Sequence, residues 1–185
     1  IEWGKDGESG EIYILQARPE TIHSRKDETK LVEYKITEAS PGKRILNGIA
    51  VGDKIATGKV VIMYSLDGRD GSHDGIDFRE GDVLVTEMTD PDWEPIMKKA
   101  SAIVTNKGGR TCHAAIVARE LGVPAIVGTG QGTDILKDGD TITVSCCEGE
   151  AGFIYKGEIP FEKIETNLSD LPEIDTPIML NVASP

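Results

Sequence analysis

Basic residues are few in this chain of 185 residues, because 20 Lys and Arg stand against 32 Asp and Glu and the formal net charge is -12. Nucleic-acid backbones bind basic surfaces, so this balance argues against a general nucleic-acid binder. It leaves room for a nucleotide site that is locally positive or uses a metal ion. No apolar run approaches the roughly 18 residues of a membrane-spanning helix. The first residues, IEWGKDG, lack both Met and a signal-peptide pattern, so we expect the chain to begin inside a longer protein.

Cysteine is also scarce. The three thiols are Cys112, Cys146 and Cys147, an odd number in which two are adjacent. No C-x-x-C pair occurs, which disfavours both a disulfide framework and a structural zinc site. We therefore expect a reducing, cytoplasmic compartment.

Short runs rich in β-branched residues follow one another between glycine, aspartate and proline, as strands do. Two helical segments interrupt them. One is DPDWEPIMKKA, in which Asp90 is a plausible N-cap and Pro91 the first helical residue. The alternation predicts an α/β fold, a compact domain with a mixed sheet. The expected strands lie in GKVVIMY, GDVLVTEM, SAIVTN, VPAIVG, DTITVS and GFIYKG.

The composition divides the chain into five parts. Residues 1–25 indicate a hairpin, with the turn-rich KDGESG between IEWG and EIYILQA. Residues 26–40 are charged and without a firm period, so we interpret them as a linker. The compact domain follows over 41–157, and 158–176 again indicate a polar linker. The last part, 177–185, holds one short apolar strand, which we interpret as the start of a further domain.

The stretch NKGGRTCHAAIVARELGVPAIVG places a histidine where a glycine turn meets a helix. A helix is expected from about Cys112 to Leu121, with Thr111 as its N-cap and Gly122 at its end. His113 then lies in the first turn, beside N–H groups without helical partners. The expected buried stripe is Ala114, Val117, Ala118 and Leu121.

This position suits phosphoryl chemistry. A helix N-terminus binds anions through its positive dipole end and free N–H groups. A neutral imidazole such as His113 can attack phosphorus and carry the phosphoryl group, with Arg110 as a further stabiliser and the glycines leaving room for a polyphosphate. The spacing alone also allows a plainer interpretation, in which His113 bonds to a loop and Thr111 only caps the helix.

The segment GGRTCHAAIVARELGVPAIVG resembles the phosphohistidine signature of the phosphoenolpyruvate (PEP)-utilising enzymes. That family includes pyruvate phosphate dikinase, phosphoenolpyruvate synthase and enzyme I of the sugar phosphotransferase system. The resemblance implies that His113 is the phosphorylated histidine. It also implies that 41–157 form a swivelling phosphohistidine domain built from β/β/α layers.

Two further resemblances concern the flanks. YILQARPET resembles the closing strand of the ATP-grasp nucleotide-binding domain, which places Glu2, Gln16 and Arg18 at nucleotide- or metal-facing positions. An ordinary exposed hairpin is the alternative. TDPDWEPIMKKA, Cys112 and IMLNVASP resemble the synthase branch, in which the last stretch begins the PEP- and pyruvate-binding TIM barrel.

The resemblance implies a phosphoryl carrier that serves the conversion of ATP, pyruvate and water to AMP, PEP and phosphate. Mg2+ and the ATP and pyruvate sites are expected mainly on flanking domains, so the fragment alone is not a complete catalyst. A bifunctional regulatory kinase and phosphorylase is expected to act on Thr111, and the full-length protein is expected to be a homodimer. The alternatives are a dikinase, which uses phosphate in place of water, and a non-catalytic swivelling module that only docks.

Overall fold

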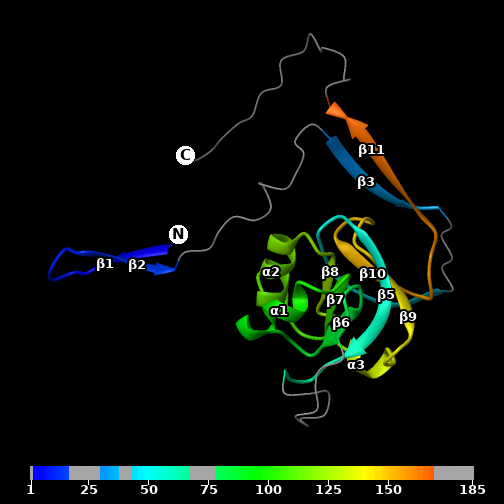
Figure 1. The fold of residues 1–185 in the computed structure, drawn as a ribbon, viewed down its shortest axis with the longest axis horizontal. Helices are drawn as coiled ribbons and strands as arrows, with labels where there is room; N and C mark the ends of the chain where they lie inside the picture. Colours follow the sequence, from blue (N-terminus) through cyan, green and yellow to red (C-terminus); the bar gives the residue numbers. More distant parts are fainter. Residues whose placement is uncertain (1, 17–29, 38–42, 67–77, 169–185) are drawn as a thin grey trace.

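Seven strands close into a barrel in the computed structural model, which describes residues 2–16, 30–37, 43–66 and 78–168 (Figure 1). Around the barrel the order is β10-β4-β8-β7-β6-β5-β9. The strands β5, β6, β7 and β8 run parallel, and the remaining pairs are antiparallel. The bounds are β4 Arg44–Val51, β5 Ile55–Ile62, β6 Val83–Thr86, β7 Ala102–Thr105, β8 Ala125–Val127, β9 Thr141–Ser145 and β10 Ala151–Lys156.

The mixed sheet and all six expected strands are confirmed, and β4 is an additional strand that the turn signals did not reveal. The division into β/β/α layers stays a prediction. The strand β9 pairs with both β5 and β10, and β10 pairs with β4, so the sheet closes on itself. Closure leaves no open sheet edge in the barrel.

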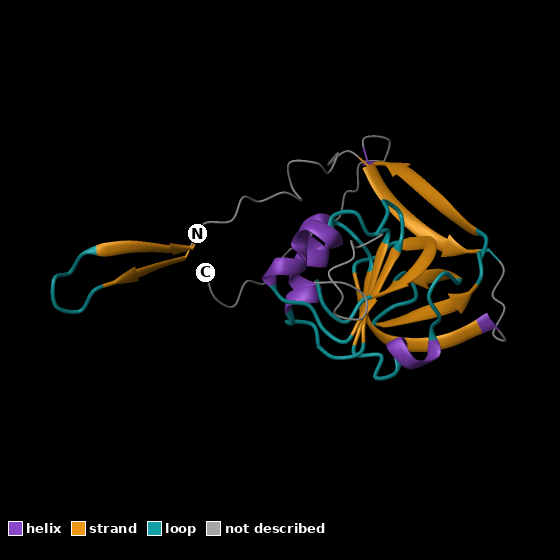
Figure 2. Ribbon diagram, turned by 60° about the horizontal axis from the view of Figure 1, so that its bottom comes forward, coloured by secondary structure: helices purple, strands orange, loops and turns teal. Residues whose placement is uncertain are grey.

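The helices are short. Those at 94–97 and 113–121 lie together on one side of the barrel, and the one at 132–135 lies apart from them (Figure 2). A 3-10 turn, Pro91–Trp93, leads into α1 (Glu94–Met97). Asp90 caps the 3-10 turn, because its carboxylate accepts a 3.0 Å hydrogen bond from the Asp92 N–H. The longest helix is α2 (His113–Leu121), and α3 (Gly132–Ile135) follows β8. The expected cap at Asp90 is therefore confirmed.

Two apolar clusters stabilise this arrangement. Alternate residues of β6 and β7 point to opposite faces, so Leu84 and Ile103 pack outside under the helices while Val83 and Val104 pack inside the barrel. The expected helical stripe is confirmed: Ala114, Val117 and Ala118 are buried against the outer cluster, and Leu121 packs against it half-buried.

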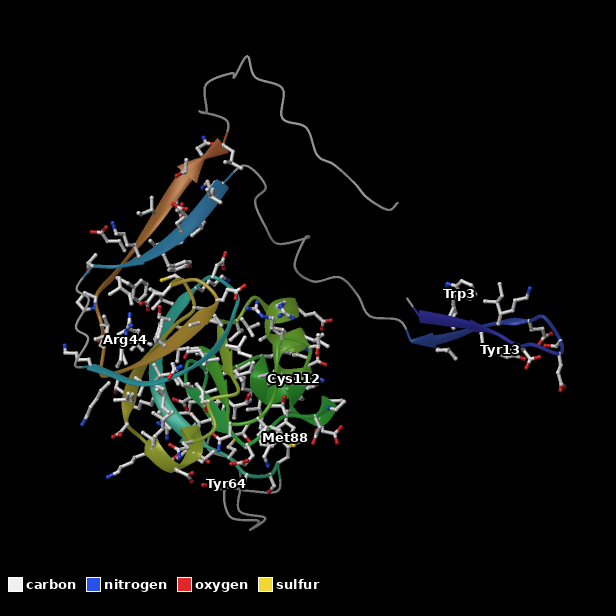
Figure 3. The ribbon with its side chains drawn as sticks, turned by 180° about the vertical axis from the view of Figure 1, so that it is seen from behind. Trp3, Tyr13, Arg44, Tyr64, Met88 and Cys112 are labelled. Carbon is white, nitrogen blue, oxygen red and sulfur yellow. The ribbon has the colours of Figure 1, made fainter. Side chains whose placement is uncertain are left out.

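A separate antiparallel hairpin is formed by β1 (Glu2–Lys5) and β2 (Ile12–Gln16), as expected for the start of the chain. Two strands alone bury little apolar surface. Its side chains Trp3 and Tyr13 are accordingly 62% and 52% exposed (Figure 3).

The two segments expected to be linkers contain strands. β3 (Lys30–Ile36) and β11 (Phe161–Asn167) pair antiparallel along their whole length, and the rings of Tyr34 and Phe161 lie 6.1 Å apart. The expectation of unpatterned chain is wrong at these residues. The alternation in KLVEYKI, with half-buried Val32 and Tyr34, was the missed signal.

Residues 177–185 lie outside the described residues. None of the described helices is long and apolar enough to cross a membrane.

Candidate active site

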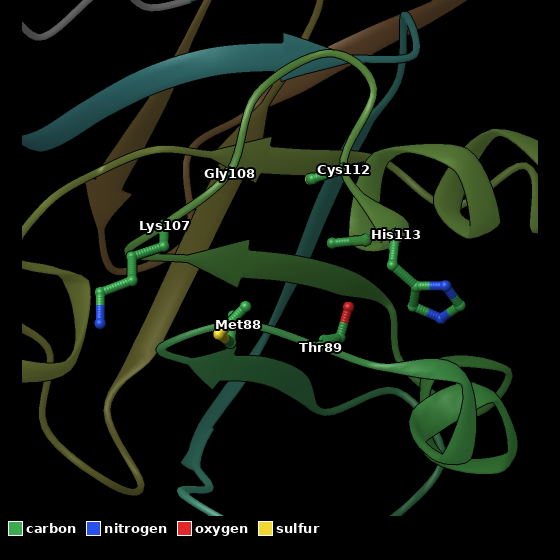
Figure 4. A pocket seen from close by; sticks show the side chains of 7 residues that line it. Met88, Thr89, Lys107, Gly108, Cys112 and His113 are labelled. Carbon is green, nitrogen blue, oxygen red and sulfur yellow. The ribbon is translucent and has the colours of Figure 1, made fainter.

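The candidate site lies at the carboxyl ends of two parallel strands of the barrel. Met88 and Thr89 follow β6, and Lys107 and Gly108 follow β7. Together with Cys112, His113 and Ala114 at the start of α2, they line a pocket of about 190 Å³ (Figure 4). In open parallel sheets, this end of the strands is where ligands commonly bind.

The turn into α2 depends on Gly108. Its φ is +117°, and a Cβ at this position would lie 2.7 Å from the Sγ of Cys112. The Cys112 N–H donates to the Gly109 carbonyl at 3.1 Å, which closes the turn. The close approach of the loop to the helix therefore requires a residue without a side chain at 108. Gly109, by contrast, has open space where a Cβ would be.

The N-cap of α2 is Cys112, so the expectation of Thr111 in that role is wrong. Cys112 has extended backbone angles, and its carbonyl accepts the first helical bond from the Ile116 N–H at 3.0 Å. No side chain caps the helix, and Thr111 is exposed one residue earlier. His113 is the first helical residue, as expected. At the other end, Gly122 takes the expected left-handed conformation with φ +66°.

His113 is half-buried, and its Nε2 is fully buried without a hydrogen-bond partner among the described residues. The same is true of the Oγ1 of Thr89. In Figure 4 the Thr89 hydroxyl extends from the loop after β6 toward the start of α2, where the His113 ring is attached. The residues that line the pocket thus contribute an uncapped helix N-terminus and two polar atoms without partners among the described residues.

A polar network behind the pocket holds the two strand ends together. The side-chain amide of buried Asn106 donates to the carboxylate of Glu87 and, at 2.7 Å, to the hydroxyl of Thr133. The backbone N–H of Thr133 donates in return to the Oδ1 of Asn106 at 3.2 Å. The Nζ of Lys107 lies 3.2 Å from Glu87. Hydrogen bonds from Asn106 and Lys107 lower the pKa of Glu87 below its ordinary value. The network links the ends of β6 and β7 to α3.

Sequence reasoning missed this network. Its detectable signal was that Glu87 and Asn106 each follow directly after an apolar strand, in VLVTE and AIVTN. Thr133, in a segment with no such pattern, gave none.

The other predicted residues lie apart from the pocket. Arg110 is exposed, and its guanidinium lies 3.2 Å from the carboxylate of Glu150. Glu2 and Gln16 are directly opposite each other across the hairpin, and Arg18 lies outside the described residues. Within the described part of the chain, no three His, Cys, Asp or Glu side chains are grouped so that they could hold a metal ion.

Comparison with known proteins identifies the region around the pocket. Residues 78–149 match the sequence model described as PEP-utilising enzyme, mobile domain. Over its whole length the chain is 55% identical to a phosphoenolpyruvate synthase of Aquifex aeolicus and 49% identical to one of Escherichia coli, and it covers 21% and 22% of those proteins. It therefore spans about a fifth of the length of these curated relatives.

Among solved structures, a solution NMR structure of an enzyme I protein is 32% identical over 44% of this chain and 33% of that chain, with a TM-score of 0.35. The sequence matches include His113, the pocket and the whole of α2. Residues 78–149 therefore match the mobile domain of the PEP-utilising enzymes, and the whole chain is similar to a segment of phosphoenolpyruvate synthases.

Proposed function

We propose that the barrel is a phosphoryl carrier and that His113 holds the phosphoryl group. The observation that carries this proposal is the position of His113. It is the first residue of an uncapped helix and lines a pocket, its buried Nε2 has no partner among the described residues, and it lies inside the stretch that matches the family. We further propose that the longer protein converts ATP, pyruvate and water to AMP, PEP and phosphate; the printed name of its relatives, phosphoenolpyruvate synthase, supports PEP as the product.

The chemistry divides into two transfers. In the first, the lone pair of an imidazole nitrogen attacks the β-phosphorus of ATP, and the bond to the α-phosphate oxygen breaks and releases AMP. Water then removes the terminal phosphate. In the second, the enolate oxygen of pyruvate attacks the remaining phosphorus, the N–P bond breaks, and a base outside this chain takes the methyl proton. A covalent intermediate replaces one difficult step with easier ones.

The residues around His113 would stabilise the transferred anion. The first N–H groups of α2 lack a side-chain acceptor, so they can donate to phosphoryl oxygens. Among the described residues, Arg110 is held only by an exposed ion pair with Glu150, an interaction worth about 0–1 kcal/mol. Its guanidinium can therefore move to an incoming phosphate at little cost.

A carrier must travel between two sites. The chain enters and leaves the barrel through β3 and β11, which pair as one ribbon. We therefore propose that the ribbon moves with the barrel and that the swivel takes place beyond it. Glu2, Gln16 and Arg18 would belong to the ATP site. Mg2+ favours a few carboxylates together with substrate phosphates, and no such group of ligands is seen in the described residues, so the proposal places the metal with ATP on the flanking domains.

Thr111 is proposed as a regulatory site for a kinase and phosphorylase. It is exposed and two residues from His113, so a modifying enzyme can reach it. A phosphate there would add about 1.5–2 negative charges beside the helix N-terminus. It would repel ATP and occupy the N–H groups that the transferred group needs.

The carrier role is tested by mass spectrometry of the full-length protein after incubation with Mg-ATP, at alkaline pH because phosphohistidine is acid-labile. We expect a phosphoryl adduct on His113. The variant His113→Ala should bind ATP, remain unmodified and form no PEP. A docking module without catalytic function predicts no adduct on the wild-type protein, and PEP formation by the variant at the wild-type rate would remove His113 from the reaction.

A further inference from the structure

Two buried polar side-chain atoms lack a hydrogen-bond partner in the described residues, and both belong to residues that line one pocket. They are the Oγ1 of Thr89, a residue only 7% exposed, and the Nε2 of His113. They come from different elements, the loop after β6 and the first turn of α2. Their coincidence in one pocket is what requires an explanation.

The unpaired hydroxyl of Thr89 is unusual within this barrel. Four other threonines are buried, and every one of their hydroxyls is hydrogen-bonded: Thr86 to the Met88 carbonyl, Thr105 to the Lys107 carbonyl, Thr133 to Glu87 and Asn106, and Thr143 to the Gly157 carbonyl. Buried polar groups in native proteins nearly always have partners, and exceptions commonly mark functional sites.

The pocket is suited to a group larger than water. Its volume of about 190 Å³ is well above the ~10–15 Å³ of probe-occupied space that one water requires. Apart from Thr89, Lys107 and His113, its walls are formed by Met88, Gly108, Cys112 and Ala114. The start of α2, with its uncapped N–H groups, gives it the polarity that favours an anion.

We propose that Thr89 is a phosphoryl-binding residue, whose hydroxyl donates a hydrogen bond to an oxygen of the phosphoryl group carried on Nε2 of His113. This inference rests on the proposed carrier function. The N–P bond forms from the Nε2 lone pair as the P–O bond to the leaving group breaks, and the proposal places one phosphoryl oxygen on the Thr89 side of the pocket. One group then provides partners for both unpaired atoms, because Nε2 is bonded to phosphorus and the hydroxyl gains an acceptor.

The proposal gives Thr89→Val a distinctive expected pattern. Valine has the shape of threonine without the hydroxyl, so the variant removes a buried polar atom that has no partner in the fold. The melting temperature should be equal to or above that of the wild type, because an unsatisfied buried group is a cost to stability. Phosphorylation of His113 by Mg-ATP should nevertheless slow by about tenfold or more, and tenfold corresponds to about 1.4 kcal/mol.

Two further variants complete the experiment in the full-length protein. Thr89→Ser retains the hydroxyl and should phosphorylate within a few-fold of the wild-type rate. Thr143→Val is the matched control, because Thr143 is buried with bonded partners on the far strand β9. It should show the opposite pattern, a lower melting temperature with a wild-type rate.

The measurements are the rate of phosphohistidine formation at alkaline pH and thermal unfolding. If the wild-type protein forms phosphohistidine and Thr89→Val forms it equally fast, the role of Thr89 is wrong while the carrier function stands. A rate that falls only together with the melting temperature would show a structural role and would also overturn the inference. If the wild-type protein forms no phosphohistidine, the carrier function and the inference both fail.

Discussion

Replacement of Gly108 by alanine tests the geometry that presents His113. Two effects oppose the substitution. The backbone has φ +117°, a conformation that costs an L residue about 1–3 kcal/mol. The new Cβ would also lie 2.7 Å from the Sγ of Cys112, and overpacking of this kind costs about 1–3 kcal/mol.

One effect acts in the other direction, because alanine reduces the entropy of the unfolded chain by about 0.4–1 kcal/mol. The net expected loss for Gly108→Ala is therefore roughly 1–6 kcal/mol. For a domain of this size the melting temperature should fall by roughly 3–6 °C for each kcal/mol lost. Because Cys112 is the residue displaced, the start of α2 should also move, and phosphorylation of His113 should slow.

The neighbouring glycine provides the control. Nothing lies within 4 Å of a Cβ at Gly109, and Gly109 is not among the residues of positive φ. Gly109→Ala should change the free energy of unfolding by no more than about 0.5 kcal/mol. Thermal unfolding followed by circular dichroism measures both variants. Equal melting temperatures for the two variants, or a Gly108→Ala protein as stable as the wild type, would refute the role assigned to the Gly108 turn.

Three further predictions concern Thr111, Glu87 and Cys146. Thr111→Val should cost less than about 0.5 kcal/mol, because no cap hydrogen bond is lost, while Thr111→Asp should strongly slow phosphorylation of His113. The pKa of Glu87 is lowered mainly by the Asn106 hydrogen bond, so its stabilising effect is present above the ordinary value of 4.5 and is lost as the pH falls through the lower folded pKa. The stability difference between wild type and Glu87→Gln should therefore shrink on acidification. Burial raises the pKa of the Cys146 thiol to about 12, so this thiol should resist alkylation at pH 8 until the protein unfolds.

Each of these has a contradicting result. Equal phosphorylation rates for the Thr111 variants would exclude electrostatic blocking at this position. If the stability difference between the wild type and Glu87→Gln stays constant from neutral to acidic pH, the lowered pKa of Glu87 does not contribute to the stability of the fold. Labelling of Cys146 as fast as a free thiol would show that the barrel wall opens there.

The sequence predicted the elements whose signals are local. Alternating apolar runs gave six strands, Asp90 and Pro91 gave the start of a helical turn, and Gly122 gave the end of α2. The strand β4 was missed because the turn signals around RILNGIAV did not reveal it. Closure of the barrel depends on pairings such as β5 with β9, which join residues 55–59 to 141–145 and leave no local signature.

The site was predictable in part for the same reason. The position of His113 followed from the helix pattern, but the cap was misplaced by one residue because Thr111 is a strong capping type and Cys112 is not. Thr89 and Asn106 were not predicted. Their roles arise where the ends of β6 and β7 come together, and an isolated threonine or asparagine after a strand has many other uses.

The central claim is that His113 carries a phosphoryl group from one substrate to another. The most direct test isolates the full-length protein after labelling with ATP that carries 32P at the β-position, and then adds unlabelled pyruvate. The account predicts that the label leaves His113 and is recovered in PEP at least as fast as the enzyme turns over. Label that remains on His113, or that is released only as inorganic phosphate while PEP forms unlabelled, would contradict it.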